Sequence, residues 1–383
     1  MKKIVSVAMA MVLALGCLTG CGESSSSRGD VFKIGGIGPL TGAVASYGDA
    51  VKKGAQIAVD EINAAGGING VRVEFKMQDD EHDAEKSVSA YNALKDWGMQ
   101  LLMGTVTSAP CIAVEAEAMN DNIFLLTPSG TAVDCIKGDN AFRLCFSDPA
   151  QGTKSAEFIG TNKLATKIAV IYDSSDPYSS GIYESFKAEA ANQNLEIVAA
   201  EAFTADSKTD FNVQLQKAKE SGAELLFLPV YYQEASLILK QANDMGFAPQ
   251  IFSCDGMDGI LTVENFDTSL AEGVMFLTPF APDAQDQKTQ DFVKAYADKY
   301  NGEVPIQFAA DAYDAIYAIK AAIEACEASC NMNASELCDV LKEAMLEIKV
   351  NGLTGEITWD ASGEPSKEPK AVVITDGVYK TMQ

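Results

Sequence analysis

The sequence predicts an α/β protein made of two doubly wound parallel-sheet lobes that are joined by hinge crossovers. Short β-rich runs alternate with amphipathic helical stretches, which is typical of parallel βαβ units. The alternation pauses after residue 145 and restarts at residue 167, so a second sheet is expected. The chain has 383 residues, 47% of them hydrophobic, which is enough for two cores.

The first half of the pattern opens with a strand at 32–37 and a glycine-rich turn. A helix is expected at 47–64, because apolar residues recur there at spacings of three or four: Val51, Ala55, Ala58 and Ile62. The other expected elements are strands at 71–77, 100–103 and 123–126, helices at 84–97 and 110–119, and a crossing strand at 141–145.

The second half repeats this order. Gly246 ends one of its helices. We expect strands at 167–172, 196–203, 224–230, 250–254 and 274–280, helices at 181–191, 211–219, 233–245, 290–300, 309–325 and 335–344, and a β-rich tail at 357–360 and 371–374. Because the chain must return between lobes, lobe 1 is predicted to comprise residues 31–150 and 279–353. Lobe 2 is predicted to comprise residues 151–278 and 354–383.

The N-terminus has the features of an export signal. Lys2 and Lys3 precede an apolar run at 4–15, which is shorter than the roughly 20 residues of a membrane span. Leu18-Thr19-Gly20-Cys21 resembles a bacterial lipobox, which implies removal of residues 1–20 and acylation of the Cys21 thiol. An ordinary signal peptide is the alternative, and Cys17 is a weaker second acceptor. Residues 21–30 are therefore predicted to form a lipid anchor and flexible tether on the extracytoplasmic face of the cell membrane.

The charge and cysteine content exclude several classes of protein. A net charge of −25 would repel nucleic acid, so no nucleic-acid partner is expected. Seven of the nine cysteines follow the anchor. Cys135 and Cys145 flank a turn-rich stretch that suggests a hairpin, so they are the preferred disulfide, with buried free thiols as the alternative. No CxxC occurs and His82 is the only histidine, so no metal site is expected.

Motifs for catalysis are weak, so no catalytic residue and no cofactor are predicted. The glycine turn after the first strand fails as a dinucleotide fingerprint, because Pro39 interrupts it, Thr41 replaces the third glycine, and Asp79 lies about 40 residues on. No P-loop or GxSxG elbow occurs. His82 lies among four carboxylates and is interpreted as a solvated loop residue.

Hydroxyl-rich turns follow two predicted strands, at 104–109 and 127–131, and Asp255 follows a third. Ligands of open α/β sheets bind beyond the carboxyl ends of strands. Hydroxyls beside free backbone N–H groups suit a carboxylate, and an aspartate suits an ammonium. The pattern therefore favours a zwitterion, with simple helix capping as the alternative for Ser108 and Thr131.

Several ordered motifs make the chain resemble the leucine/isoleucine/valine-binding proteins of bacterial ABC importers, which have the type I periplasmic-binding fold. The resemblance runs from about residue 31 to the end. Its motifs are the following: Gly38-Pro39-Leu40-Thr41-Gly42, Tyr47-Gly48, Asp60-Glu61-Ile62-Asn63, Gly66-Gly67-Ile68-Asn69-Gly70 and Thr127-Pro128-Ser129.

The resemblance implies a set of ligand contacts. Ser108, Thr131 and backbone groups around Ser129 would hold the ligand carboxylate, and Asp255 would pair with its ammonium. Three aromatic residues would close over the ligand: Tyr47, Tyr178 and Tyr231. Two departures from the family are present: the family carries a glutamate where Asp255 stands, and its first-lobe disulfide has no cysteines here.

The expected function is that of a lipid-anchored ABC-importer binding protein for an aliphatic, branched-chain amino acid, with a membrane permease as its partner. Asp255 is one methylene shorter than glutamate, which leaves the side-chain specificity open. The alternatives are a related solute, such as an amide, urea, a short peptide or an aromatic acid, and a ligand-sensing receptor without transport. An enzyme is the weakest alternative.

Overall fold

The computed structural model describes residues 31–382, and the predictions for the signal peptide, Cys21 and the tether lie outside this range. The first sheet is entirely parallel, with strand order β2-β1-β3-β4-β5. Its strands are β1 (Val31–Gly38), β2 (Arg72–Asp79), β3 (Leu101–Gly104), β4 (Leu125–Thr127) and β5 (Ala141–Arg143). The helices between them are α1 (Ala45–Ala64), α2 (Ala84–Trp97) and α3 (Ser108–Asp121).

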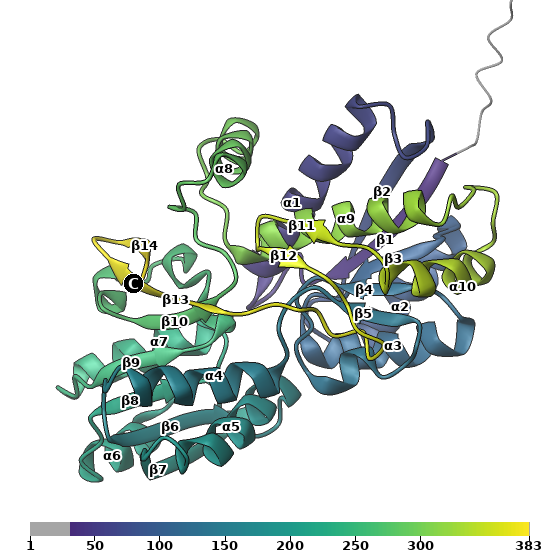
Figure 1. The fold of residues 1–383 in the computed structure, drawn as a ribbon. Helices are drawn as coiled ribbons and strands as arrows, with labels where there is room; N and C mark the ends of the chain where they lie inside the picture. Colours follow the sequence, from purple (N-terminus) through teal and green to yellow (C-terminus); the bar gives the residue numbers. More distant parts are fainter. Residues whose placement is uncertain (1–30, 383) are drawn as a thin grey trace, which may run out of the picture. The chain divides into compact units, whose positions relative to one another are not determined.

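The second sheet has the order β14-β13-β10-β9-β8-β6-β7. Its strands are β6 (Lys167–Asp173), β7 (Glu196–Phe203), β8 (Leu225–Leu228), β9 (Gln250–Ser253), β10 (Met275–Thr278), β13 (Lys370–Thr375) and β14 (Val378–Thr381). The associated helices are α4 (Asp148–Thr161), α5 (Pro177–Ala190), α6 (Asn212–Glu220) and α7 (Tyr232–Asp244). The yellow hairpin β13–β14 extends this sheet beside β10 in antiparallel pairing (Figure 1).

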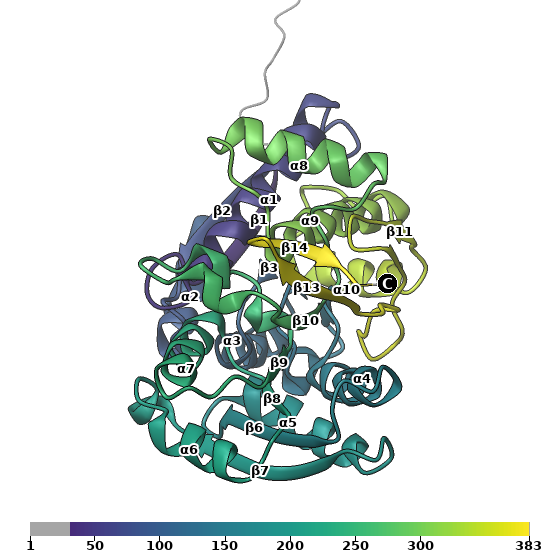
Figure 2. The ribbon, with the colours of Figure 1, turned by 90° about the vertical axis from the view of Figure 1, so that its left-hand side faces the viewer.

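The remaining elements lie between β10 and β13 in the sequence: α8 (Gln287–Lys299), α9 (Gln307–Ala325), α10 (Ala334–Met345), β11 (Val350–Asn351) and β12 (Glu356–Ile357). Figure 2 shows α8 beside α1, and α9 also packs on α1. Since α9 and α10 also contact β3, the chain leaves the second sheet after β10 and returns to it at β13. Together with the passage from β5 to β6, the chain passes between the sheets three times. The lobe boundaries near residues 150, 279 and 353 stay a prediction.

The predicted two-sheet α/β fold is confirmed, and three elements were not expected: α4, β14 and the two-residue strand β11, which pairs with β12 in a separate two-stranded sheet. Helix α4 was not expected because its segment has Pro149 at its second position and contains two glycines, and so lacks a clear apolar stripe. Strand β14 was also missed, because it is four residues long and follows a tight turn.

The long apolar face of α1 explains how the first core forms. The predicted stripe is buried, and Val51, Ala55 and Ala58 are all fully covered. Gly54 allows α9 to approach, because a Cβ at this position would lie 2.0 Å from the carbonyl oxygen of Ala309. This close approach holds the start of α9, including Phe308, next to the start of α1.

The glycine-rich turn after β1 is held by one carboxylate. Asp79 Oδ1 accepts hydrogen bonds from the N–H groups of Leu40 and Thr41 at 2.8 and 3.3 Å, and Oδ2 accepts from the Thr41 hydroxyl at 2.6 Å. These bonds lower the pKa of Asp79, although burial raises it. The turn is therefore held by a side chain from the end of the neighbouring strand β2.

Candidate solute-binding cavity

All seven predicted ligand contacts line one cavity, which we name the tyrosine cavity. Its walls are Tyr47, Val106, Thr107, Ser108, Ser129, Thr131, Tyr178, Tyr231, Asp255, Gly256 and Phe308. The cavity volume is about 10 Å³, roughly the space of one water molecule. The side chains of the site therefore fill it almost completely in this conformation.

The hydroxyl wall of the tyrosine cavity comes from the first sheet. Thr127 ends β4, and Ser108 opens α3, whose first N–H groups have no acceptor within the helix. The hydroxyls of Ser108 and Thr131 lie 3.3 Å apart, and Ser108 Oγ also accepts from the N–H of Ala132 at 3.2 Å. Ser129 Oγ donates to the carbonyl of Val106 at 2.7 Å. The Ser129 hydroxyl is thus already engaged, which leaves its backbone available.

The acidic wall comes from the second sheet. Asp255 directly follows β9 and Cys254, and is 5% exposed. Its Oδ1 accepts from the Tyr178 hydroxyl at 2.8 Å, and that hydroxyl accepts from the N–H of Gly256 at 2.9 Å. Burial raises the pKa of Asp255 to about 6, against the lowering effect of the bonds from Tyr178 and Gln151. A buried carboxylate without a cationic partner is a suitable acceptor for an ammonium group.

Stacked aromatic rings close the space between the two walls. Tyr178 and Tyr231 stack with centroids 4.7 Å apart, and Tyr47 stacks on Phe308 at 4.1 Å. The Tyr47 hydroxyl donates to the carbonyl of Gly256 at 2.5 Å, which links α1 to the turn after β9. A Cβ at Gly256 would lie 2.6 Å from the Tyr178 hydroxyl, so this contact requires glycine.

Phe308 and Gln307 were missed by sequence reasoning. The amide of Gln307 donates to the carbonyl of Asp255 at 2.8 Å, and Phe308 lies against Tyr47. Both belong to the first turn of α9, whose pattern reads simply as a buried helix. The Gln-Phe pair at the start of that helix was the only sequence feature that could have indicated these site residues, and it is a weak indication.

The interpretation of His82 as a solvated loop residue is wrong. Its side chain is 23% exposed, and Nδ1 lies 2.9 Å from the Thr107 hydroxyl. The ring packs edge-on against Tyr231, and Nε2 lies 3.8 Å from Asp176. Burial and the nearby Lys208 lower the pKa of His82 to about 4, so the ring is neutral at pH 7.

Asp148 is a buried acid next to this site that sequence reasoning did not single out. It is 1% exposed, and neither carboxylate oxygen accepts a hydrogen bond from the described residues. Burial raises its pKa well above the usual range, and the charge of Asp255 acts in the same direction, whereas the positive charge of the buried Arg143 opposes the rise. The site therefore holds two buried carboxyl groups, Asp148 and Asp255, with Arg143 near Asp148.

The predicted Cys135–Cys145 disulfide is wrong, because both residues are free thiols. Cys135 lies in a short 3-10 turn, and its sulfur faces the carbonyl of Ser108 at 3.7 Å. Cys145 follows β5, which pairs in parallel with β4 and forms no hairpin. The intervening turn therefore does not bring the two sulfurs together.

No cluster of His, Cys, Asp and Glu side chains between residues 31 and 382 could hold a metal ion. Within the same range, no helix combines the length and hydrophobicity that crossing a membrane would need.

Comparisons with known proteins show the family to which the chain belongs. The sequence matches the family described as periplasmic binding protein over residues 31–373. A Leu/Ile/Val-binding protein homologue of Brucella melitensis is 33% identical over 307 residues, which cover 79% of this chain and 81% of the relative. A leucine-, isoleucine-, valine-, threonine- and alanine-binding protein of Pseudomonas aeruginosa is 29% identical and covers 79% of this chain and 80% of its own.

A solved structure supports the same assignment. The branched-chain amino acid transporter substrate-binding protein LivJ of Streptococcus pneumoniae, in complex with isoleucine, superposes with a TM-score of 0.83. It is 31% identical and covers 92% of this chain and 99% of its own. Together with the two-sheet fold, these likenesses confirm the predicted family. The chain belongs to the periplasmic binding protein family, whose members are substrate-binding proteins and not enzymes.

Proposed function

We propose that the chain is an extracytoplasmic lipoprotein that binds a branched-chain amino acid in the tyrosine cavity and delivers it to an ABC-importer permease. The observation that carries this proposal is the opposition of two walls across one cavity. Ser108 and Thr131 present hydroxyls from one sheet, and Asp255 presents a buried carboxylate from the other. These groups complement the carboxylate and the ammonium of an amino acid.

The aromatic residues suit an aliphatic side chain. An apolar group can pack against the rings of Tyr47, Tyr178 and Tyr231. The Tyr231 hydroxyl has no hydrogen-bond partner among the described residues. Because the cavity volume is about that of one water molecule, an amino acid can enter only when the rings rotate or the walls separate. We therefore propose hinge opening for entry and a ligand that stabilises the contact between Tyr47 and Gly256.

The test is a thermal shift of the chain against the twenty amino acids, followed by calorimetry on every hit. A micromolar ligand at millimolar concentration adds about 4 kcal/mol of stability by mass action. Shifts with leucine, isoleucine or valine are the expected result. A shift only with an amide, urea, a peptide or an aromatic acid that lacks the amino-acid ammonium would contradict the assigned role of Asp255.

The membrane anchor is tested separately. Metabolic labelling with palmitate is expected to mark the wild type and Cys17→Ser, but not Cys21→Ser. Equal labelling of all three proteins would contradict the proposal that Cys21 is the acylated residue. Loss of leucine uptake after deletion of the gene, restored by the wild-type chain, is the expected sign of a permease partner.

A further inference from the structure

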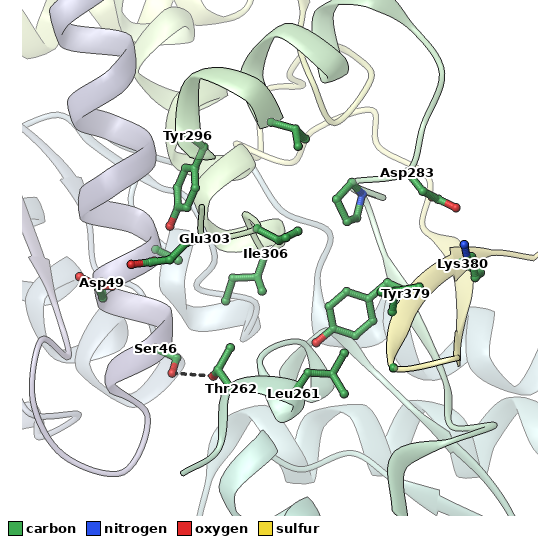
Figure 3. Close-up of a pocket in the computed structure, with 16 residues that line it drawn as sticks. Ser46, Asp49, Leu261, Thr262, Asp283, Tyr296, Glu303, Ile306, Tyr379 and Lys380 are labelled. Atoms are coloured by element: carbon green, nitrogen blue, oxygen red, sulfur yellow. Dashed lines mark hydrogen bonds between the residues drawn. The ribbon is translucent and has the colours of Figure 1, made fainter. Parts of the chain in front are cut away.

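A second and larger cavity, which we name the apolar cavity, has a volume of about 750 Å³ and shares no lining residue with the tyrosine cavity (Figure 3). This size is in the range of pockets that enclose small molecules. Its walls come from α1, α8, β14, the segment 303–306, the short 3-10 turn Ile260–Thr262 and the connection after β10. The lining residues are Ser46, Asp49, Ala50, Leu261, Thr262, Pro282, Asp283, Val293, Tyr296, Glu303, Val304, Ile306, Gly377, Val378, Tyr379 and Lys380.

Apolar side chains form the body of this cavity. Leu261, Val293 and Ile306 line it from three different segments. Val304 and Val378 also line it and are 64% and 47% exposed. Covering these side chains with an apolar group would remove them from water and stabilise the complex.

The polar groups at one end of the cavity carry an unbalanced negative charge. Asp49 and Glu303 both pair with the single ammonium of Lys53, at 2.6 and 2.5 Å, so two carboxylates share one cation. Tyr296 is 3% exposed, and its hydroxyl lines the cavity without a hydrogen-bond partner among residues 31–382. Figure 3 shows this hydroxyl on the same side of the cavity as Asp49 and Glu303.

The opposite end is balanced in charge. Asp283 and Lys380 lie there together, and Asp283 accepts from the Thr381 hydroxyl at 3.2 Å (Figure 3). The charged residues at both ends, with Lys53 included, therefore sum to one negative charge. An anion would meet this excess charge, and a neutral molecule could bond to the Tyr296 hydroxyl but would leave the excess carboxylate without a cation.

We propose that the apolar cavity binds an apolar monocation, namely an alkyl- or arylammonium compound. Its ammonium lies at the end formed by Asp49 and Glu303, where the Tyr296 hydroxyl accepts one of its hydrogen bonds. Its hydrocarbon part covers Leu261, Ile306 and Val378. The cavity would select such a ligand over neutral and anionic molecules because the ligand combines a positive charge at the Asp49 end with apolar contacts along the remaining walls.

Occupancy of this cavity couples to the solute, an inference that rests on the proposed function. The apolar cavity is bounded by α1 on one side and by Thr262 and β14 on the other, and the Ser46 and Thr262 hydroxyls meet across it at 3.0 Å. The next residue, Tyr47, holds the tyrosine cavity together through Gly256. A molecule that bridges the same two sides favours the same arrangement, so each ligand raises the affinity for the other by one common factor.

The binding test uses n-hexylammonium, with 1-hexanol and hexanoate as matched probes, in calorimetry on the full chain. Asp255→Ala is the background, because hexylammonium could otherwise enter the tyrosine cavity as an amino-acid mimic. Hexylammonium is expected to bind about three- to fivefold more tightly than 1-hexanol, the ratio for a half-exposed charge pair, and hexanoate is expected to bind weakest. Glu303→Gln is expected to abolish this preference, and Lys380→Gln is expected to keep it.

Absence of hexylammonium binding, equal binding of all three probes, or a preference that survives Glu303→Gln would overturn the proposal. Val378→Lys places a cation at the exposed rim without touching the core, and is expected to weaken hexylammonium binding at least threefold. An unchanged melting temperature for each variant shows that the fold is intact. These measurements do not involve leucine, so their failure leaves the proposed function standing.

The coupling test measures, in the wild type, the affinity for each ligand with and without the other ligand bound. Saturating hexylammonium is expected to raise leucine affinity about fivefold, and saturating leucine is expected to raise hexylammonium affinity by the same factor. Competition between the two would show that hexylammonium enters the tyrosine cavity and would overturn the coupling. If leucine fails to bind while Asp255→Ala still selects hexylammonium, the proposed function fails and the second site stands.

Discussion

The two walls of the tyrosine cavity both present polar groups near the ends of strands, but they differ in charge and in hydrogen bonding. Ser108 and Thr131 are neutral and hydrogen-bonded to each other and to the backbone. Asp255 is ionisable and buried, and it is neighboured by a second buried acid, Asp148. Neutral hydroxyls remain satisfied without a ligand, whereas a buried carboxylate loses solvation and gains no cation in exchange.

This difference indicates which wall contributes more to the free energy of amino-acid binding. A ligand ammonium relieves an existing electrostatic penalty at Asp255, whereas a ligand carboxylate must replace hydrogen bonds that already exist at the hydroxyl wall. We therefore expect the acidic wall to dominate affinity and the hydroxyl wall to contribute less. The following experiments test this ranking of the two walls.

The largest effect is expected for Asp255→Ala. Removal of the carboxylate leaves the ligand ammonium buried without a partner, which costs about 2–5 kcal/mol, or roughly 30- to 5000-fold in leucine affinity. Calorimetry with leucine measures the loss. Unchanged affinity would show that Asp255 is not the ammonium partner, and Asp258→Ala, which changes another buried aspartate of the same turn, is the matched comparison.

A smaller effect is expected for the hydroxyl wall. The double variant Ser108→Ala and Thr131→Ala removes two uncharged donors that already have partners, so each contributes the net value of an ordinary hydrogen bond, about 0.5–1.5 kcal/mol. Leucine affinity is therefore expected to fall by about 5- to 150-fold, which is less than with Asp255→Ala. A greater loss than for Asp255→Ala would reverse the proposed ranking of the walls.

The pH dependence should follow Asp255. Because burial raises its pKa to about 6, acidification protonates the carboxyl, and leucine affinity is expected to fall by about tenfold per pH unit below that value. Calorimetry between pH 5 and 8 measures the slope. A flat profile would contradict the role of the charged carboxylate.

The raised pKa of Asp255 also determines how the stability of the ligand-free protein depends on pH. The folded protein holds the Asp255 proton up to a pKa of about 6, whereas the unfolded chain releases it near 3.9, so the stability of the free protein falls as pH rises between these values. Asp255→Asn is therefore expected to raise the melting temperature at pH 8 and to leave it nearly unchanged at pH 4. A lower melting temperature at pH 8 would mean that the carboxylate stabilises the free protein.

The smallest effect is expected for Tyr178→Phe. This change removes the hydroxyl that donates to Asp255 and accepts from Gly256, but keeps the ring that stacks on Tyr231. Loss of one hydrogen bond to a charged group is expected to weaken leucine binding about three- to tenfold and to raise the pKa of Asp255. The shift should appear as a higher midpoint in the pH profile. An unchanged midpoint would show that the Tyr178 bond does not tune Asp255.

Local patterns were sufficient for the two sheets and for the ligand candidates that follow strands. Asp255 and Thr131 were found because parallel strands place their carboxyl ends at one edge of a sheet. The aromatic contacts came from the family resemblance, because tyrosines in helix starts have no periodicity of their own. The same reasoning failed at Cys135 and Cys145, where a turn-rich segment leads into a parallel strand and not a hairpin.

The sequence by itself determined the order of strands and helices through local periodicity. It also determined the family and the seven candidate contacts, through the resemblance of its motifs and the residue types at element ends. Only the tertiary structure decided that Phe308 stacks on Tyr47, that His82 is half-buried, and that Asp148 is buried near Asp255. These contacts join segments distant in the chain. Their burial, and hence their charge states, depends on how the two sheets and α9 meet.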